Sequence, residues 1–436
     1  MAPCADPGRS YRIMHVILVP LGSIGDVYPF VALGRELRGR GHRVTMIASA
    51  HFSDLAHGSG FEFAASVSSE DYLSLIDHPD FWHPLRSMHL LITRSVNPAI
   101  AVIYDLIKQY YRPGEGAVVA GTLAWGARVA QEALGLPLTT VHLQPIAIRS
   151  RHEPAAYPGL HWFRQLPVGW RPAAYRLIDA VSDHCYAGPL KAFRRKLGLP
   201  PIQGLFGQWW HSPESTLALF PPWYAPPQPD WPGQIRACGF PLYDSGKLEP
   251  PEFDLDAYFA DGEAPIVFAS GSARTRCAEF FATSAAACEI LGQRALFVTR
   301  FANQLPRPLP PLIRHVHYVP YSRLLPRAAV LVHHGGIGTV AQALKAGVPQ
   351  LVAPCCYDQF DNAEHLRRQG VGETVLREHY TPANVAAVLR RLLDAPGVHA
   401  RCIVTATQFS TGNPLIPAVA ALEEYWNQPR SNGWGS

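Results

Sequence analysis

The chain has 436 residues, a length that favours two domains over a single core. Its composition, 48% hydrophobic and 17% charged residues, is typical of a folded globular protein. The net charge of +4 is small for this length and gives no support for a nucleic-acid partner. We find no signal-peptide pattern and expect no membrane-spanning segment. The predicted location is the cytoplasm, with peripheral association with a membrane left open.

The eight cysteines are scattered singly, apart from the adjacent Cys355 and Cys356. No C-x-x-C spacing occurs, so the sequence indicates neither a disulfide framework nor a zinc site. We therefore expect a reducing compartment and no bound metal.

The first half of the sequence alternates strand and helix patterns. Residues 14–20, "MHVILVP", form a continuous apolar run typical of a strand buried on both faces. Helical spacing follows over 27–41, and a second strand is predicted over 42–49. The alternation continues over 116–145, which predicts a parallel sheet with helices on both faces.

Two stretches interrupt this alternation, at 67–111 and at 149–210, and both are rich in aromatic residues and proline. Large aromatic side chains can simply fill a core. They can also line a site for an apolar ligand, and the sequence leaves both interpretations open.

A domain boundary is predicted near 219–234, "LFPPWYAPPQPDWPGQ", because its six prolines cannot sustain a helix or a central strand. Strand and helix patterns restart at 264. We predict a first domain at 1–235, a linker at 236–252 and a second domain at 253–436, with the last helix packing back on the first domain. The fold class is α/β, with two doubly wound Rossmann-like domains whose strand ends face a shared cleft.

The most informative motif is "HHGGIGT" at 333–339, between a predicted strand and a predicted helix. Its glycines allow close approach of the backbone, and the free N–H groups at the start of the helix favour an anion. His334 adds a donor that can be charged near neutral pH. These features suit a diphosphate.

A carboxylate and an amide, Asp358 and Gln359, follow the next predicted strand. Such a pair can accept hydrogen bonds from hydroxyl groups and donate to them. A diphosphate pocket beside a hydroxyl-binding pair is what a nucleotide sugar requires.

This segment resembles the donor-binding signature of the family-one glycosyltransferases, which have the GT-B fold; their bacterial form reads "HHGGxGT" followed by "DQ". The resemblance implies that His334, Gly336, Gly338 and Thr339 bind the diphosphate and that Asp358 and Gln359 bind the sugar. It also places Ser272 of "SGS" near the diphosphate, and Tyr318 and Val319 near the nucleotide base. Plant relatives have a tryptophan at the base, so the choice of base stays open.

The loop "GSIGDVYP", residues 22–29, resembles the N-terminal loop of bacterial antibiotic and lipid glycosyltransferases. In related enzymes the aspartate of this loop is the general base, which implies that role for Asp26. The alternative is that Asp26 only caps a helix beginning at Val27, and the two roles can coexist. We expect Gly22, Ser23 and Gly25 to approach the acceptor, with His142 a minor candidate for lining its pocket.

Further segments, including "FGQWWHSP" and "GFPLYD", resemble the bacterial rhamnolipid rhamnosyltransferase branch of the family, which implies dTDP-rhamnose as donor and a hydroxyacyl lipid as acceptor. The rival is a UDP-glucose-dependent enzyme acting on a polyketide, carotenoid or phenolic acceptor. A non-catalytic activator and a nucleotide-sugar epimerase are more distant alternatives. No cofactor is expected, since the nucleotide sugar is a substrate.

Two other patterns resemble metal sites. Asp254 and Asp256 form a D-x-D sequence, which we interpret as a solvated helix cap because a proline-rich linker precedes it. His315 and His317 alternate along a predicted strand without a third ligand nearby.

Overall fold

The computed structural model describes residues 12–243, 253–260, 262–271, 276–409 and 412–428. Most of the predicted linker, 244–252, therefore lies outside the described residues, as does Ser272.

The N-terminal sheet has seven parallel strands in the order β3-β2-β1-β4-β5-β6-β7. Its strands are β1 His15–Val19, β2 Arg43–Ser49, β3 Glu62–Val67, β4 Gly116–Gly121, β5 Leu138–His142, β6 Thr216–Ala218 and β7 Ile235–Ala237. The helices of this half are α1 Ile24–Gly39, α2 Ser53–Gly58, α3 Ser69–Ile76, α4 Ser87–Leu91, α5 Asn97–Tyr110, α6 Trp125–Leu134, α7 His161–Gln165, α8 Arg171–Tyr186 and α9 Gly188–Lys196.

The C-terminal sheet has six parallel strands in the order β10-β9-β8-β11-β12-β13. Its strands are β8 Ile266–Ala269, β9 Ala295–Val298, β10 Ile313–Val316, β11 Val330–His333, β12 Gln350–Val352 and β13 Gly372–Thr374. The helices are α10 Leu255–Ala260, α11 Ala278–Leu291, α12 Tyr321–Leu324, α13 Ile337–Ala346, α14 Gln359–Gln369, α15 Pro382–Asp394, α16 Pro396–Thr407 and α17 Leu415–Trp426.

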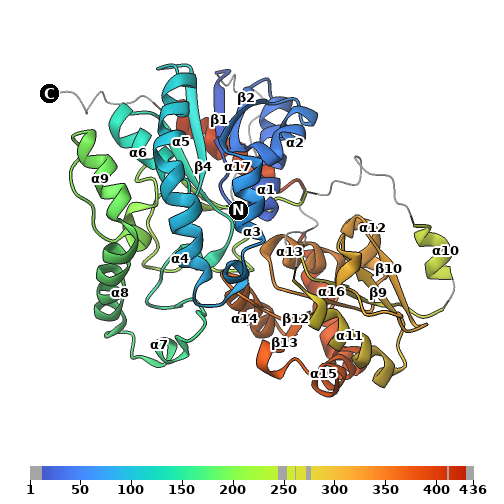
Figure 1. Cartoon of the computed structure of the whole chain (residues 1–436). Helices are drawn as coiled ribbons and strands as arrows, with labels where there is room; N and C mark the ends of the chain where they lie inside the picture. The colour runs from blue at the N-terminus through green and yellow to red at the C-terminus, as the bar shows by residue number, and fades with distance from the viewer. Residues whose placement is uncertain (1–11, 244–252, 261, 272–275, 410–411, 429–436) are drawn as a thin grey trace.

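Both sheets are doubly wound, which confirms the predicted fold class (Figure 1). The central strands β1 and β8 are almost wholly buried, as their continuous apolar sequences predict. Since all strands of a sheet run parallel, the loops at their carboxyl ends gather at one edge, where ligands of such sheets bind.

Two boundaries differ from the sequence predictions. Helix α1 begins at Ile24 rather than at Val27, because Ser23 takes the N-cap position. Strand β7 extends the N-terminal sheet to Ala237, two residues beyond the predicted end of the first domain at 235.

The last helix, α17, packs against α1 and buries its apolar face, including Leu415, Ala418 and Leu422 (Figure 1). Glu423 is 1% exposed and accepts hydrogen bonds from Arg40 at 2.8 Å and His42 at 3.1 Å. The polypeptide therefore returns to the first domain after completing the second.

One continuous helical segment, Ser87–Tyr110, is long and apolar enough to cross a membrane by composition, which the sequence analysis did not anticipate. Half of its most apolar window is buried inside the structure, and a core helix has the same composition. Its apolar residues include Ile100, Ile103 and Ile107, which belong to the N-terminal core. The segment is thus weak evidence for a membrane span.

We predict that Glu423→Ala lowers the free energy of unfolding by about 3–5 kcal/mol, because it leaves Arg40 and His42 without their buried carboxylate. Chemical denaturation followed by circular dichroism measures this loss. The matched control is Glu424→Ala, whose half-exposed carboxylate pairs with Arg236, and its cost is at most about 1 kcal/mol. Equal losses in the two variants would show that α17 is not held by the buried triad.

Candidate functional site

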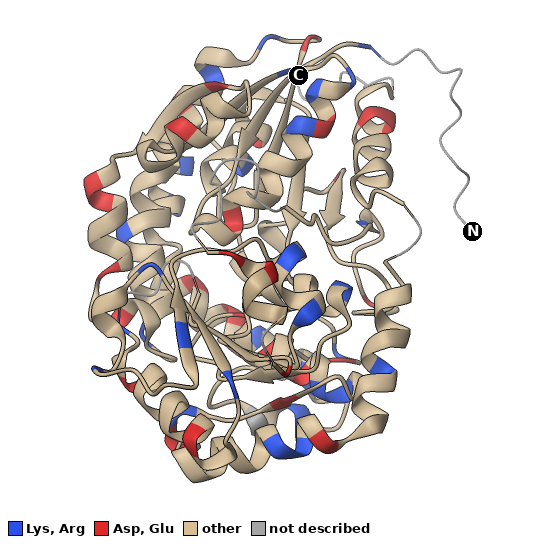
Figure 2. Ribbon diagram, turned by 90° about the vertical axis from the view of Figure 1, so that its right-hand side faces the viewer, with Lys and Arg blue, Asp and Glu red and all other residues tan. Residues whose placement is uncertain are grey.

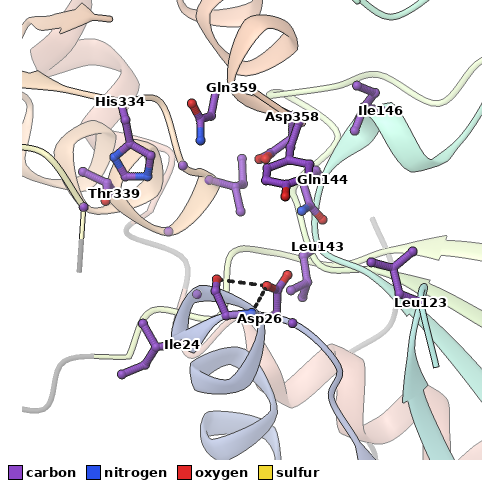
Figure 3. A pocket seen from close by; sticks show the side chains of 18 of the residues that line it. Ile24, Asp26, Leu123, Leu143, Gln144, Ile146, His334, Thr339, Asp358 and Gln359 are labelled. Atoms are coloured by element: carbon purple, nitrogen blue, oxygen red, sulfur yellow. Dashed lines mark hydrogen bonds between the residues drawn. The ribbon is translucent and has the colours of Figure 1, made fainter. Parts of the chain in front are cut away.

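A cleft of 710 Å³ lies where the carboxyl ends of the two sheets face each other. Its lining comes from both domains, with Asp26 on one side and His334, Asp358 and Gln359 on the other (Figure 3). Residues more than 300 positions apart in sequence therefore line one space.

Asp26 occupies the third position of α1, not its N-cap. Its Oδ2 accepts hydrogen bonds from the Ser23 backbone N–H at 2.8 Å and from the Ser23 hydroxyl at 3.1 Å. Both bonds engage Oδ2, so Oδ1 is left available to the cleft. The carboxylate therefore stabilises the start of the helix and also has an oxygen for chemistry.

Burial raises the pKa of Asp26 to about 6, against the hydrogen bonds from Ser23, which lower it. The group is thus ionised at neutral pH but far more basic than an ordinary aspartate. A general base of this kind needs a pKa near the working pH.

The glycine loop before α1 is shaped around this carboxylate. Gly22 has φ of +138°, and a Cβ atom there would overlap Oδ2 of Asp26. Gly22, Ser23 and Gly25 all line the cleft. His142 does not: it is fully buried under the cleft, with its ring nitrogens bonded to Thr122 and His211. Placing His142 on the acceptor surface was wrong, because the side chain at the end of β5 points into the sheet packing.

The two histidines of "HHGGIGT" have different roles. His333 is fully buried between the Gln350 amide at 3.0 Å and the Gly335 N–H at 3.1 Å, and burial lowers its pKa to about 3. It is therefore a neutral residue that holds the turn. His334 lines the cleft.

The ring of His334 lies between two glycines. A Cβ atom at Gly271 would come within 2.8 Å of the ring, and one at Gly336 within 2.6 Å. Gly336 is also the N-cap of α13, so the ring lies beside the free N–H groups of that helix. Gly338 and Thr339, in the first turn, line the cleft too. The arrangement presents positive electrostatic potential to an anion.

Asp358 and Gln359 begin α14 on the same side of the cleft. The side-chain oxygen of Gln359 accepts hydrogen bonds from the backbone N–H groups of Cys355 at 2.8 Å and Cys356 at 3.2 Å. Its amide N–H₂, one hydrogen of which points to the Cys356 Sγ at 3.8 Å, is then the group that can donate to a ligand. Burial and the charge of Asp26 raise the pKa of Asp358 to about 7.

Asn362 is a site residue that the sequence analysis missed. Its buried amide donates to the Gly335 carbonyl at 2.9 Å and to Asp358 at 2.7 Å. Its oxygen accepts from the hydroxyl of Tyr224, in the proline-rich segment, at 3.2 Å. The spacing of four residues after Asp358, one helical turn, is the signal that could have identified it.

Tyr357 and Gln144 were also missed. Tyr357 has φ of +54°, the left-handed region that non-glycine residues rarely adopt, and its hydroxyl donates to the Phe81 carbonyl at 3.0 Å. This strained residue connects the loop before Asp358 to the first domain. Gln144 follows β5, and its side chain lines the same cleft as Asp358 (Figure 3). No sequence pattern marks either residue.

Tyr318 and Val319 both line the cleft, just beyond the end of β10. Val319 is 1% exposed and packs in the core, so its contact with the cleft is slight. The Tyr318 ring lies under the guanidinium of Arg300, 5.8 Å from it, which makes a polar as well as an aromatic surface.

The half of the cleft within the first domain is mainly apolar. Its lining includes aromatic and aliphatic side chains of the two stretches that interrupt the sequence alternation: Phe81, Trp82, Leu85, Met88, Tyr157, Leu160, Ile178, Tyr186, Phe206 and Trp210. A cation, Arg149, stands in this wall and pairs with Asp179 at 2.5 Å. The structure thus favours an apolar-ligand site over mere core filling for these stretches.

The D-x-D sequence is a helix cap, as interpreted: Asp254 accepts from the backbone N–H groups of Asp256 and Ala257 at the start of α10. Asp256 pairs with Arg327 on the surface. His315, on β10, donates to the Thr299 carbonyl at 2.9 Å. Among the described residues, no group of three or more His, Cys, Asp or Glu side chains is placed to hold a metal ion.

Two family models match the sequence. Residues 16–144 match the glycosyltransferase family 28 N-terminal domain, and residues 296–415 match the erythromycin biosynthesis protein CIII-like C-terminal domain. The two matches contain the loop of Asp26 and the "HHGGIGT" and Asp-Gln motifs.

Full-length relatives show the same resemblance. The chain is 30% identical to O-mycaminosyltylonolide 6-deoxyallosyltransferase of Streptomyces fradiae, over 96% of this chain and 99% of the relative. Its fold is similar to the glycosyltransferase of kitacinnamycin, with a TM-score of 0.71 and 23% identity over 95% and 100% of the two chains. It is also similar to the spinosyn rhamnosyltransferase SpnG complexed with thymidine diphosphate, with a TM-score of 0.66 and 21% identity over 94% and 100%.

We predict that Gly335→Ala lowers the free energy of unfolding by about 2 kcal/mol or more. The residue has φ of +95°, and an added Cβ would lie 2.7 Å from Val352 and 3.1 Å from the Gln359 carbonyl. The matched control is Gly338→Ala, because no atom lies within 4 Å of its Cβ and alanine favours the helix. Urea denaturation measures both variants. Equal free energies of unfolding for the two variants would contradict the close packing of Gly335 against Val352 and Gln359.

Proposed function

We propose that this chain, which belongs to the family-one glycosyltransferases of the GT-B fold, transfers rhamnose from dTDP-rhamnose to a hydroxyl of an apolar hydroxyacyl lipid. The observation that carries the proposal is one continuous cleft, with a basic carboxylate from one domain facing an anion-binding helix start from the other.

The chemistry is a single inverting displacement. Asp26 Oδ1 takes the proton of the acceptor hydroxyl while the acceptor oxygen bonds to the anomeric carbon, and the bond to the nucleoside diphosphate breaks. Proton removal by a positioned base contributes typically ~10²–10⁴-fold. His334 and the N-terminus of α13 stabilise the charge on the leaving diphosphate, so the proposed reaction requires no metal.

The residues that read the sugar are Asp358 and Gln359, assisted by Gln144. Gln359 donates through its amide, because its oxygen is engaged within the loop. Asp358, with a pKa of about 7, can accept from a hydroxyl or donate to one. Asn362 holds this carboxyl in place from behind.

The donor assignment is supported by the names of the relatives, a 6-deoxyallosyltransferase and a rhamnosyltransferase with bound thymidine diphosphate. Both names denote 6-deoxyhexose transfer. The apolar first-domain wall supports a large apolar acceptor. A UDP-glucose-dependent enzyme for a polyketide, carotenoid or phenolic acceptor is the second candidate, which the same wall also suits.

The donor test compares dTDP-rhamnose with UDP-glucose at equal concentration, using 3-hydroxydecanoic acid as acceptor and liquid chromatography to detect the glycoside. We expect at least about a tenfold higher kcat/KM with dTDP-rhamnose, since each lost hydrogen bond to the donor costs roughly 1 kcal/mol or more. A preference for UDP-glucose would overturn the assignment of rhamnose as the donor sugar, but the assignment of the protein as a glycosyltransferase would stand.

The base is tested by Asp26→Asn, which we expect to lower kcat by about 10²–10⁴-fold while dTDP binding is retained. In the unaltered protein the rate should fall as the pH drops through about 6, because the raised pKa of Asp26 makes protonation inactivate the base there. The part of the acid limb near pH 6 should be absent from the residual activity of the variant, which retains only the titration of Asp358, whose pKa is about 7 in the unaltered protein.

Asp71→Asn is the matched control for this test. Asp71 holds the corresponding third position of α3, on the surface, where its carboxylate accepts from the Ser68 hydroxyl and its backbone N–H donates to that hydroxyl. The substitution Asp71→Asn should leave kcat unchanged and should not alter the fall in rate at low pH. If Asp26→Asn behaves like this control, Asp26 is only a helix cap and the base lies elsewhere.

A further inference from the structure

We propose that the outer surface of residues 149–196, which contain α7, α8 and α9, binds an anionic phospholipid bilayer. This inference concerns where the protein works and does not depend on which sugar it transfers.

The first observation is charge. Residues 149–196 contain nine Lys and Arg but three Asp and Glu, a net charge of +6, whereas the whole chain has +4. The remainder of the sequence is therefore slightly acidic. In contrast, residues of both signs are interspersed over the side of the molecule seen in Figure 2.

The three acidic residues of this segment are engaged internally. Asp179 pairs with Arg149, and Asp183 accepts from the backbone N–H groups of Gly204 and Leu205. Glu153 pairs with Arg368 of α14. Four cations of the segment are exposed and have no carboxylate partner among the described residues: Arg151, Arg176, Arg195 and Lys196. Two other cations of the segment, Arg164 and Arg194, pair with Glu364 and Glu132. The four exposed cations therefore make the outer surface of the segment cationic.

The second observation is the two-sided character of α8, a helix of 16 residues with none buried. Side chains one helical turn apart share a face. Tyr175, Ile178, Ser182 and Tyr186 line the cleft. A second stripe, Trp170, Ala174, Leu177 and Val181, follows the same spacing on another face. It covers no part of the core.

This second stripe is strongly exposed: Trp170 is 70% exposed, Leu177 68% and Val181 56%. Trp162 of α7 is 51% exposed and Leu85, beside Gly159, is 69% exposed. Exposed apolar groups in this number mark an interaction surface. Exposed tryptophans are typical of surfaces that bind at the lipid–water boundary.

A second copy of the protein fits this surface less well. In a twofold dimer the same patch would meet itself, so its unpaired cations would face one another. An anionic bilayer instead offers both a negative surface for the cations and an apolar layer for the stripe. Figure 1 places α8 and α9 at the edge of the molecule, away from the C-terminal sheet, where they are accessible to a flat surface.

Two exposed apolar residues link the proposed membrane-binding surface to the cleft. Leu85 and Met88, which line the cleft, are also exposed at 69% and 37%. With α8 on the bilayer, an apolar acceptor can pass from the lipid into the cleft without crossing water.

The experiment is co-sedimentation of the whole protein with vesicles, either POPC alone or POPC with 30% POPG. We expect binding only with POPG, weakened by raising NaCl from 50 to 500 mM. The double variant Trp170→Ser with Leu177→Ser should bind POPG vesicles at least about tenfold more weakly than the unaltered protein. Its matched control is Ile403→Ser with Val404→Ser on α16, where both side chains are more than 60% exposed.

A second pair tests the charge. Arg195→Gln with Lys196→Gln should weaken binding several-fold, whereas Arg390→Gln with Arg391→Gln on α15, also exposed, should not. The proposal is overturned if the unaltered protein does not bind POPG vesicles. It is also overturned if each double variant binds these vesicles as tightly as its matched control. It is also overturned if sedimentation velocity shows a dimer that Trp170→Ser dissociates. Because vesicle binding needs no sugar, its failure is distinct from a failure of the proposed reaction.

Discussion

The geometry of the cleft depends on one buried amide. Asn362 bonds the carbonyl of the glycine turn, the carboxyl of Asp358 and the hydroxyl of Tyr224 at the same time. The first contact holds the glycine turn, the second orients the carboxyl of Asp358 and the third joins both to the first domain. Buried polar networks of this kind specify a single arrangement, because any unmade bond inside the protein is costly.

Further contacts of α14 hold the two domains together around this network. Residues of α14 also bond the first domain through Asp361 to the Ala156 N–H and through Glu364 to Arg164. The two domains are therefore held with Asp26 and Asp358 close enough for the charge of one to affect the pKa of the other.

Much of this architecture could be predicted from the sequence, because its signals are local. Apolar runs indicate buried parallel strands such as β1, and "HHGGIGT" indicates a turn and a helix start within seven residues. What could not be predicted depends on distant partners. The interdomain bonds of Tyr224 and the strained backbone of Tyr357 have no sequence pattern. His142 looked available at a strand end, but its burial is decided by His211, 69 residues away.

The close fit between Gly22 and the carboxylate of Asp26 has an evolutionary consequence. Any side chain at position 22 would compete for the space of the carboxylate at position 26, so position 22 is restricted to glycine as long as Asp26 keeps this conformation. A lineage that replaced the glycine would have to give up the carboxylate as well, and would then need a base from another element. Within a family, a side chain at position 22 should therefore occur only where the carboxylate at position 26 is absent or displaced, whereas the glycine can persist after that carboxylate is lost.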